Sequence, residues 1–322
     1  MDIDTIIRGI PEQFAYTPNV EYADALPKTP VRVVVGGMGG SHLPAGIVRA
    51  ALPDLPIIIH HNYGLPNADA VSRGGTLFVA VSFSGNTEET LDFAHAALDA
   101  GLPLAIATSG GALLELAKER GVPHVAVPKG PEGFQPRMAV GYLSVALLAL
   151  LGKEKERAAL AAAASAAPSS VEAEGRALGA FLADGIPLIY SSAANRGFAY
   201  YLKALLNETP KLAAFINEFP EINHNEMLGV LKSRELPELR FVFLRDGTDY
   251  PRTAKRMQVF AELVAEAGAQ SRDVALPENP YEKIAHFVML ANWAAAEASA
   301  KRGVDPFDID LVEDFKKRMA KG

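Results

Sequence analysis

The chain has no cysteine among its 322 residues. Disulfide bonds and thiolate chemistry are therefore excluded, and a zinc site would depend on histidine and carboxylate ligands alone. Long basic runs are also missing, and the formal net charge is −7. This charge balance argues against nucleic acid as a partner.

A segment typical of membrane proteins or exported proteins is missing as well. The longest apolar stretch, residues 138–151, is shorter than the roughly 20 residues that span a bilayer, and it contains Gly141 and Ser144. The N-terminus is acidic and lacks the apolar core of a signal peptide. We therefore expect a soluble cytoplasmic protein without membrane contact. Its length and its 49% hydrophobic content suffice for two domains with filled cores.

A hydroxyl-rich segment follows one predicted buried strand. Residues 77–81 are apolar or β-branched, and Ser82, Ser84 and Thr87 come directly after them, before a helical pattern. The first N–H groups of a helix lack internal partners, and the helix dipole favours an anion there. Gly85 lets the backbone approach a ligand closely. The pattern predicts a phosphate-binding loop. The alternative is that Thr87 simply caps the helix, because serine and threonine are ordinary N-caps.

A second loop of the same kind follows the strand expected at residues 31–35. It contains Gly39, Gly40 and Ser41, and a helix is expected after it. The glycine spacing differs from that of a dinucleotide-binding loop, and the next strand, residues 57–60, ends without the acidic residue that would bind a ribose. Two such loops fit one small phosphorylated ligand better than a dinucleotide.

Strands and helices alternate along the chain, which predicts βαβ crossovers. The expected fold class is α/β, with two doubly wound parallel-sheet domains that carry helices on both faces. We expect an N-terminal, phosphate-binding domain at residues 1–152, a helical linker at 153–184 that is broken near Pro168, and a C-terminal domain at 185–322. The expected strands are residues 31–35, 57–60, 77–81, 104–107 and 122–127 in the first domain and 187–190, 212–216, 240–244 and 271–276 in the second. Open parallel sheets bind ligands beyond the carboxyl ends of their strands, and both phosphate loops lie at such ends.

An arginine and two histidines are further candidates. Pro136 can begin a helix and places Arg137 in its first turn, where a cation gains nothing from the helix dipole. A functional role for Arg137 is therefore favoured, with a solvated or salt-bridged arginine as the alternative. His60 and His61 follow each other on a strand and point to opposite faces, which makes them a poor metal pair. We expect these histidines to be structural or adjacent to the substrate.

Several motifs together resemble one enzyme family. In chain order they are Gly-Gly-Met-Gly-Gly-Ser at residues 36–41, Ser-Phe-Ser-Gly-Asn-Thr-Glu-Glu-Thr at 82–90, Pro-Arg at 136–137, Asn-Glu-Thr at 207–209, Asn-His-Asn at 223–225 and Arg-Gly-Val-Asp-Pro at 302–306. The hydroxyl loop alone resembles the phosphosugar loop of SIS (sugar isomerase) domains. The ordered set, which extends over most of the chain, resembles the bifunctional phosphoglucose/phosphomannose isomerases, which have two SIS domains.

The resemblance implies a role for each matching residue. The phosphate of a sugar phosphate would be bound by Gly39, Gly40, Ser41, Ser82, Ser84 and Thr87. Glu208 matches the catalytic base, Arg137 the arginine that stabilises an enediolate, and His224 the histidine that assists ring opening. The family brings this histidine in from the other subunit, which implies a homodimer. Lys316 matches a C-terminal lysine near the sugar ring.

These residue types suit aldose–ketose isomerisation. A carboxylate can move a proton between neighbouring carbons, a fixed cation stabilises the enediolate, and a histidine can transfer the proton that ring opening needs. The resemblance thus implies interconversion of glucose 6-phosphate and fructose 6-phosphate, with mannose 6-phosphate as a second, less certain substrate. It implies no metal or organic cofactor. On the residues alone, Glu218, Glu221 and Glu226 are rival bases.

Two positions depart from the family pattern. His42 stands where the family has a glycine after the first Gly-Ser, and Ile309 stands where a threonine linked to the handling of both epimers is common. Activity on mannose 6-phosphate is therefore a weaker expectation than activity on glucose 6-phosphate. Two alternatives stay open: another phosphosugar isomerase or amino-sugar enzyme, and a non-catalytic sugar-phosphate sensor. The presence of a base, a cation and a histidine in the family's order argues against the sensor.

Overall fold

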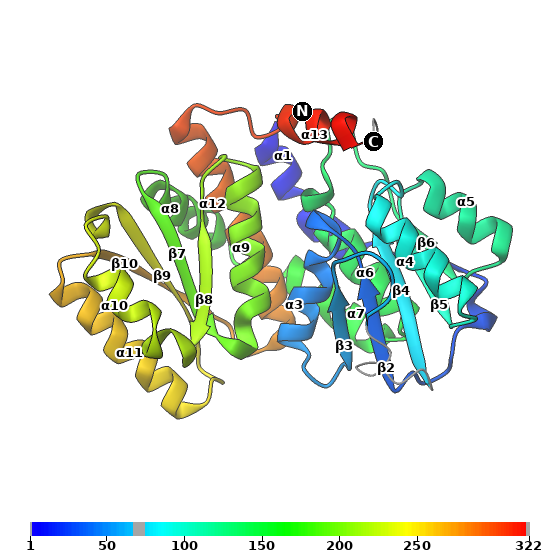
Figure 1. Ribbon diagram of the computed structural model, residues 1–322, viewed down its shortest axis with the longest axis horizontal. Coiled ribbons are helices and arrows are strands. Elements are labelled where there is room, and N and C mark those ends of the chain that lie inside the picture. The colour runs from blue at the N-terminus through cyan, green and yellow to red at the C-terminus, as the bar shows by residue number, and fades with distance from the viewer. Residues whose placement is uncertain (1, 67–74, 320–322) are drawn as a thin grey trace.

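Two β-sheets flank a central layer of helices in the computed structural model, which describes residues 2–66 and 75–319 (Figure 1). The first sheet has the strand order β1-β6-β5-β4-β2-β3, and the second has the order β10-β9-β7-β8. Among the described residues, all strand pairs are parallel except β1 with β6. The strands are β1 (Val20–Glu21), β2 (Arg32–Gly36), β3 (Ile57–His60), β4 (Thr76–Ser82), β5 (Leu104–Thr108), β6 (His124–Ala126), β7 (Ile186–Ser192), β8 (Phe215–Phe219), β9 (Leu239–Asp246) and β10 (Gln270–Leu276).

Helices cover both faces of each sheet. They are α1 (Ile3–Arg8), α2 (Ile10–Ala15), α3 (Leu43–Ala51), α4 (Glu88–Asp99), α5 (Gly111–Arg120), α6 (Val140–Leu150), α7 (Glu154–Ser165), α8 (Ser170–Leu182), α9 (Arg196–Glu208), α10 (Glu226–Leu231), α11 (Pro251–Glu266), α12 (Pro280–Arg302) and α13 (Asp310–Met319). Figure 1 shows α4 and α5 on the outer face of the first sheet, α11 outside the second, and α3 and α9 between the two sheets. Helix α6 contributes Leu143 and Leu147 to the same central core.

Each strand contributes side chains to two separate cores, because successive residues of a strand point to opposite faces. In β2, Val33 and Val35 pack toward the central helices, whereas Val34 packs into the outer core beneath α4 and α5. In β9, Val242 belongs to the central core and Phe243 to an outer core against α11. The central core continues through both halves of the chain. The expected α/β class with parallel sheets and helices on both faces is therefore confirmed.

The helical segment after the first sheet is interrupted where the sequence predicts it. Helix α7 ends at Ser165 and α8 begins at Ser170, so that Pro168 lies between them. The boundaries at residues 152 and 184 stay predictions. At the N-terminus, before the first expected strand, the chain forms the two short helices α1 and α2 and the short strand β1, which extends the first sheet in the antiparallel sense.

The strand expected at residues 212–216 is wrong in its position. β8 instead runs from Phe215 to Phe219 and pairs with β7 from Leu188 onward. The reason is that the backbone of Leu212 has other partners. Its N–H donates to Leu206 O at 2.9 Å, and its carbonyl accepts from the Asn207 side chain at 2.9 Å. The end of α9 therefore holds this stretch away from the sheet.

Candidate active site

The two predicted phosphate loops lie side by side beyond the carboxyl ends of β2 and β4. The strand order of the first sheet reverses between these neighbouring strands, which is where open α/β sheets bind ligands. The first loop includes a 3₁₀ turn at Gly39–Ser41. Ser41 Oγ accepts a hydrogen bond from the backbone N–H of Phe83 at 2.9 Å, which joins the first loop to the second. Gly85 has a φ of 73°, and a Cβ there would lie 1.7 Å from Gly110 O, so that only glycine fits.

The hydroxyl groups of both loops are arranged to donate. Ser41 Oγ and Ser84 Oγ accept from backbone N–H groups, Ser84 from Asn86 at 3.3 Å, and no acceptor among the described residues takes their own O–H groups. Ser82 and Thr87 share a hydrogen bond at 2.8 Å, which uses one of their two O–H groups. The side chain of Thr87 makes no capping bond to α4, so capping does not explain this hydroxyl. A phosphate, which accepts hydrogen bonds, suits this set of donors.

Replacing Ser84 with alanine is expected to weaken the binding of inorganic phosphate by about 1–3 kcal/mol, the cost of losing a hydrogen bond to a charged group. Ser233→Ala is the matched control, because Ser233 Oγ also accepts from the N–H two residues later, Glu235 at 3.1 Å, but follows α10 in the second half of the chain. Calorimetric titration of both variants with phosphate measures the difference. Equal affinities for the two variants would move the anion site away from Ser84.

The first phosphate loop packs directly against Arg137. A Cβ on Gly40 would lie 2.5 Å from the backbone nitrogen of Arg137, so the two backbones touch and a larger residue would separate them. Arg137 belongs to a short 3₁₀ turn, Pro136–Met138, with Pro136 at its start. The expected single helix from Pro136 is therefore wrong in detail, because α6 begins only at Val140. The turn brings the arginine beside the anion loop.

The Arg137 guanidinium is buried and joins three parts of the chain. The residue is 1% exposed, and it donates to Glu208 Oε2 at 3.2 Å, to Thr209 Oγ1 at 3.2 Å and to Pro306 O at 2.6 Å. A cavity of about 10 Å³, too small for a bound sugar, lies beside it. Burial lowers the pKa of Arg137, and the Glu208 carboxylate opposes this effect. Arginine stays charged even so, and a fixed cation results.

Glu208 is the last residue of α9, and its carboxylate faces Arg137. Its side chain is 39% exposed, so that a ligand can reach the carboxylate while Arg137 stays buried behind it. The structure thus brings Gly40, Ser41, Arg137 and Glu208 into one continuous chain of contacts. A half-exposed carboxylate beside a buried cation can move a proton where negative charge develops.

The structure does not bring His224 to Glu208 within one chain. Glu208 ends α9, which runs against the direction of the parallel strands, so it lies at their amino ends. His224 is exposed and ends a 3₁₀ turn, Glu221–His224, beyond the carboxyl end of β8. The five residues of β8 alone span roughly 16 Å. Glu208 shares its partner Arg137 with Pro306, which lies shortly before α13. In Figure 1, α13 lies at the top, whereas α10, which follows His224, lies at the lower left.

Lys316 also lies apart from the other candidates. It belongs to α13, which buries none of its residues, and its Nζ donates to Glu313 on the same helix at 2.7 Å. Within the described parts of the chain, no hydrogen bond or ion pair joins Lys316 to Arg137 or Glu208. The role of Lys316 stays a prediction.

His42, which departs from the family pattern, is buried beside the first phosphate loop. Its ring packs against His61 at 5.6 Å and Tyr200 at 5.3 Å between ring centroids, and its Nδ1 has no hydrogen-bond partner within the described residues. Burial, followed by the charge of His61, lowers the pKa of His42 to about 4, against a smaller opposing effect of the Gly39 backbone. His42 is therefore neutral at neutral pH and adds no charge to the anion site.

The corresponding point of the second sheet, between β7 and β9, is filled by the protein's own charges. Asp246 accepts from Lys283 Nζ at 2.5 Å and from Asn195 Nδ2 at 2.9 Å, and all three side chains are buried. Burial raises the pKa of Asp246, but hydrogen bonds from Lys283 and Thr248 outweigh it and hold this pKa below its usual range. An internal carboxylate thus occupies the switch point of the second sheet, so the second unit does not repeat the loop arrangement that is predicted to bind an anion in the first.

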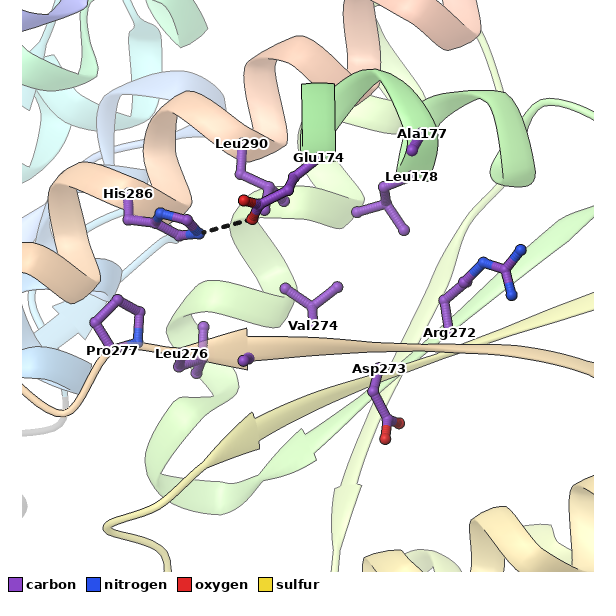
Figure 2. A pocket seen from close by; sticks show the side chains of 11 residues that line it. Glu174, Ala177, Leu178, Arg272, Asp273, Val274, Leu276, Pro277, His286 and Leu290 are labelled. Atoms are coloured by element: carbon purple, nitrogen blue, oxygen red, sulfur yellow. Dashed lines mark ion pairs between the residues drawn. The ribbon is translucent and has the colours of Figure 1, made fainter. Parts of the chain in front are cut away.

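A larger groove, of about 560 Å³, lies against β10 and holds none of the predicted site residues. Figure 2 shows Glu174 and His286 pointing toward each other above this strand, with 3.7 Å between His286 Nε2 and the Glu174 carboxylate. Apolar side chains, among them Val274 and Leu290, form much of its lining. Burial lowers the pKa of His286 and Glu174 raises it. The groove lacks the hydroxyl and glycine donors of the anion loops.

Neither a metal cluster nor a membrane span occurs in the described part of the chain. Within residues 2–66 and 75–319, no group of three or more histidine, aspartate and glutamate side chains could hold a metal ion. No helix in those same ranges is long and apolar enough to cross a membrane.

Sequence reasoning missed three neighbours of Arg137 and Glu208. Thr209 and the carbonyl of Pro306 accept hydrogen bonds from Arg137, and Lys211 donates to the carbonyl of Glu208 at 3.1 Å. Thr209 and Pro306 stand inside two of the motifs that carry the family resemblance, which was the available signal. No pattern in the sequence marks Lys211.

Known proteins resemble this chain in sequence over most of its length. A family model described as the bacterial phospho-glucose isomerase C-terminal SIS domain matches residues 172–319. A bifunctional phosphoglucose/phosphomannose isomerase from Thermoplasma acidophilum is 31% identical over 292 residues, which cover 89% of this chain and 89% of that protein. A protein of the same description from Aquifex aeolicus is 30% identical over 334 residues and 99% of both chains.

A solved structure shares the fold over nearly the whole chain. It is a hypothetical protein from Thermus thermophilus, with a TM-score of 0.73 and 18% sequence identity, and the match covers 98% of this chain and 88% of that one. At this identity the likeness shows the fold alone. The two relatives above match across both halves at about 30% identity, and the chain therefore belongs to the bifunctional phosphoglucose/phosphomannose isomerase family.

Proposed function

We propose that the protein interconverts glucose 6-phosphate and fructose 6-phosphate through a cis-enediolate. The observation that carries the proposal is the unbroken contact from the phosphate loops through Gly40 and Arg137 to Glu208. A sugar phosphate bound at the loops would place its first carbons beyond the phosphate, on the side where Arg137 and Glu208 meet. Membership in the family supports the same assignment.

In this mechanism each residue has one task. Glu208 takes the proton from one of the two neighbouring carbons and returns it to the other, as a partly exposed carboxylate can. Arg137 stabilises the negative oxygens of the enediolate, and its burial fixes its position before the reaction. A guanidinium has five N–H donors, and Arg137 uses three of them in bonds to described residues, so that two remain for the enediolate oxygens.

Ring opening is assigned to His224, with Lys316 near the sugar ring, as the resemblance implies. No metal or organic cofactor is part of the proposal, and we place the activity in the cytoplasm, as expected from the sequence. Because Ile309 stands directly before α13, where a threonine is common in the family, we propose mannose 6-phosphate as the poorer substrate.

A coupled assay of the purified protein on fructose 6-phosphate tests this function, with glucose 6-phosphate and mannose 6-phosphate scored separately. We expect glucose 6-phosphate as the faster product. A folded protein that binds phosphate but forms neither product would contradict the proposal and favour a sugar-phosphate sensor. Conversion of an amino-sugar phosphate instead would move the assignment to a different phosphosugar enzyme.

The proposal includes a homodimer in which His224 serves the partner's site, because one chain keeps His224 and Glu208 at opposite ends of the strands of the second sheet. Mixing two inactive variants, Glu208→Gln and His224→Ala, should then restore up to about a quarter of the activity, since a two-fold hybrid has one intact site. The control mixture, Glu208→Gln with Arg137→Met, should stay inactive because both changes fall in the same chain's site. Absence of recovery after verified subunit exchange would mean that each site is built within one chain.

A further inference from the structure

Lys211 links parts of the candidate site, although the mechanism above gives it no task. Its φ of 52° lies in the left-handed region, which residues other than glycine rarely adopt. Its Nζ donates to the backbone oxygens of Glu208 at 3.1 Å, Thr209 at 3.2 Å and Asp305 at 2.7 Å. An ammonium group has three N–H donors, so these three bonds use all of them. The contacts connect the end of α9 with a segment far along the chain.

Arg137, the other cation of the site, binds the carbonyl of Pro306, the residue after Asp305. Arg137 donates to Pro306 O at 2.6 Å, so that two adjacent cations bind two consecutive carbonyls, those of Asp305 and Pro306. The same cations contact Glu208, Arg137 through the carboxylate and Lys211 through the backbone. The segment then leads to α13 and Lys316.

Arg137 and Lys211 lie close enough for the charge of one to affect the pKa of the other. Packing alone does not favour two neighbouring positive charges. Burial lowers the pKa of Lys211, and the charge of Arg137 lowers it further, against Asp308, Asp305 and Glu208, which raise it. Three carbonyl acceptors compensate for this repulsion and for the left-handed backbone. The repulsion from Arg137 and the left-handed backbone both destabilise the folded state, and a lysine elsewhere in a loop would avoid them.

We propose that Lys211 is a positioning residue of the isomerase, which sets the distance between the Glu208 carboxylate and the segment 305–309 that carries α13. While Arg137 binds the enediolate, Lys211 keeps Asp305 bound to the end of α9, and the segment stays in place through the reaction. This inference rests on the proposed function, and it adds a residue to which neither the sequence motifs nor the mechanism assigns a role.

Three variants separate positioning from folding. Lys211→Gly suits the left-handed backbone but removes the ammonium, Lys211→Met removes the charge and keeps the side-chain length, and Lys211→Arg keeps a cation. We expect Lys211→Gly and Lys211→Met to lower kcat on fructose 6-phosphate by roughly 10- to 100-fold, as small displacements of catalytic groups do. Lys211→Arg should recover much of that loss. The affinity for inorganic phosphate and the midpoint of thermal unfolding of Lys211→Gly should stay near those of the wild type.

Hydrogen exchange of the amides in residues 303–310 is the second readout and needs no activity. We expect faster exchange there in Lys211→Gly than in the wild type, with unchanged exchange in the phosphate loops. Wild-type kcat and wild-type exchange in Lys211→Gly would overturn the inference. Loss of kcat together with equal losses of phosphate binding and thermal stability would overturn it too, in favour of a structural lysine. If the wild type lacked isomerase activity, the proposed function would fail, whereas the exchange result would still decide whether Lys211 holds the segment.

Discussion

Replacing Glu208 with glutamine is expected to lower kcat for the conversion of fructose 6-phosphate by about 10²- to 10⁴-fold, the usual contribution of a general base. Glutamine keeps the shape of the side chain and can still contact Arg137, but it cannot take a proton. The phosphate loops do not depend on this side chain, so KM and the affinity for inorganic phosphate should change little. Steady-state kinetics on fructose 6-phosphate measure both effects.

The rival carboxylates provide the controls for this prediction. The structure places all three near the carboxyl end of β8, where Glu226 accepts from Tyr190 at 2.6 Å, Glu221 from Asn225 at 2.9 Å, and Glu218 pairs with Arg196 at 3.6 Å. Changing each of the three to glutamine should leave most of the activity. A collapse of activity in one of them, with Glu208→Gln still active, would show that the base is misassigned.

Replacing Arg137 with lysine is expected to lower kcat by about 10²- to 10³-fold, the effect of removing one preorganised donor from a developing negative charge. Lysine keeps the positive charge but cannot reproduce the planar fork that contacts Glu208, Thr209 and Pro306 at once. Because the side chain is buried, the midpoint of thermal unfolding must be measured together with the kinetics.

Arg240 offers a matched control for this buried arginine. It is 9% exposed and its guanidinium donates to backbone carbonyls, including Pro237 at 2.9 Å and Asp184 at 3.2 Å, away from the candidate site. Arg240→Lys should lower stability without changing kcat. If Arg137→Lys resembled it, with lower stability and wild-type kcat, Arg137 would have a structural role only.

The sequence predicts the positions of the two glycine- and hydroxyl-rich loops because their features are local. Strand periodicity, glycines such as Gly40 and Gly85, and the hydroxyls between a strand and a helix are all visible within a few neighbouring residues. The dipole argument for Arg137 is local too, and the structure buries this side chain beside the loop. The resemblance then supplies Glu208, which local reasoning leaves among four equivalent carboxylates.

Other features depend on contacts between distant segments and could not be predicted. The position of β8 follows from the hydrogen bonds that Leu212 makes to the end of α9. The position of Lys211 follows from its left-handed backbone and from Asp305, which joins it only through the fold. The filled switch point of the second sheet likewise needs Lys283 of α12 to reach Asp246 of β9.

Proton transfer through Glu208 is the central claim, and its most direct test is the isomerisation of fructose 6-phosphate in deuterated water. The wild-type protein should form glucose 6-phosphate that carries deuterium at C2 in part of the product, because a carboxylate that has taken the proton exchanges it with solvent before returning it. Glu208→Gln should form this product, and exchange the C1 proton of fructose 6-phosphate, about 10²- to 10⁴-fold more slowly than the wild type. Deuterium incorporation into glucose 6-phosphate at the wild-type rate in Glu208→Gln would contradict a proton transfer by this residue.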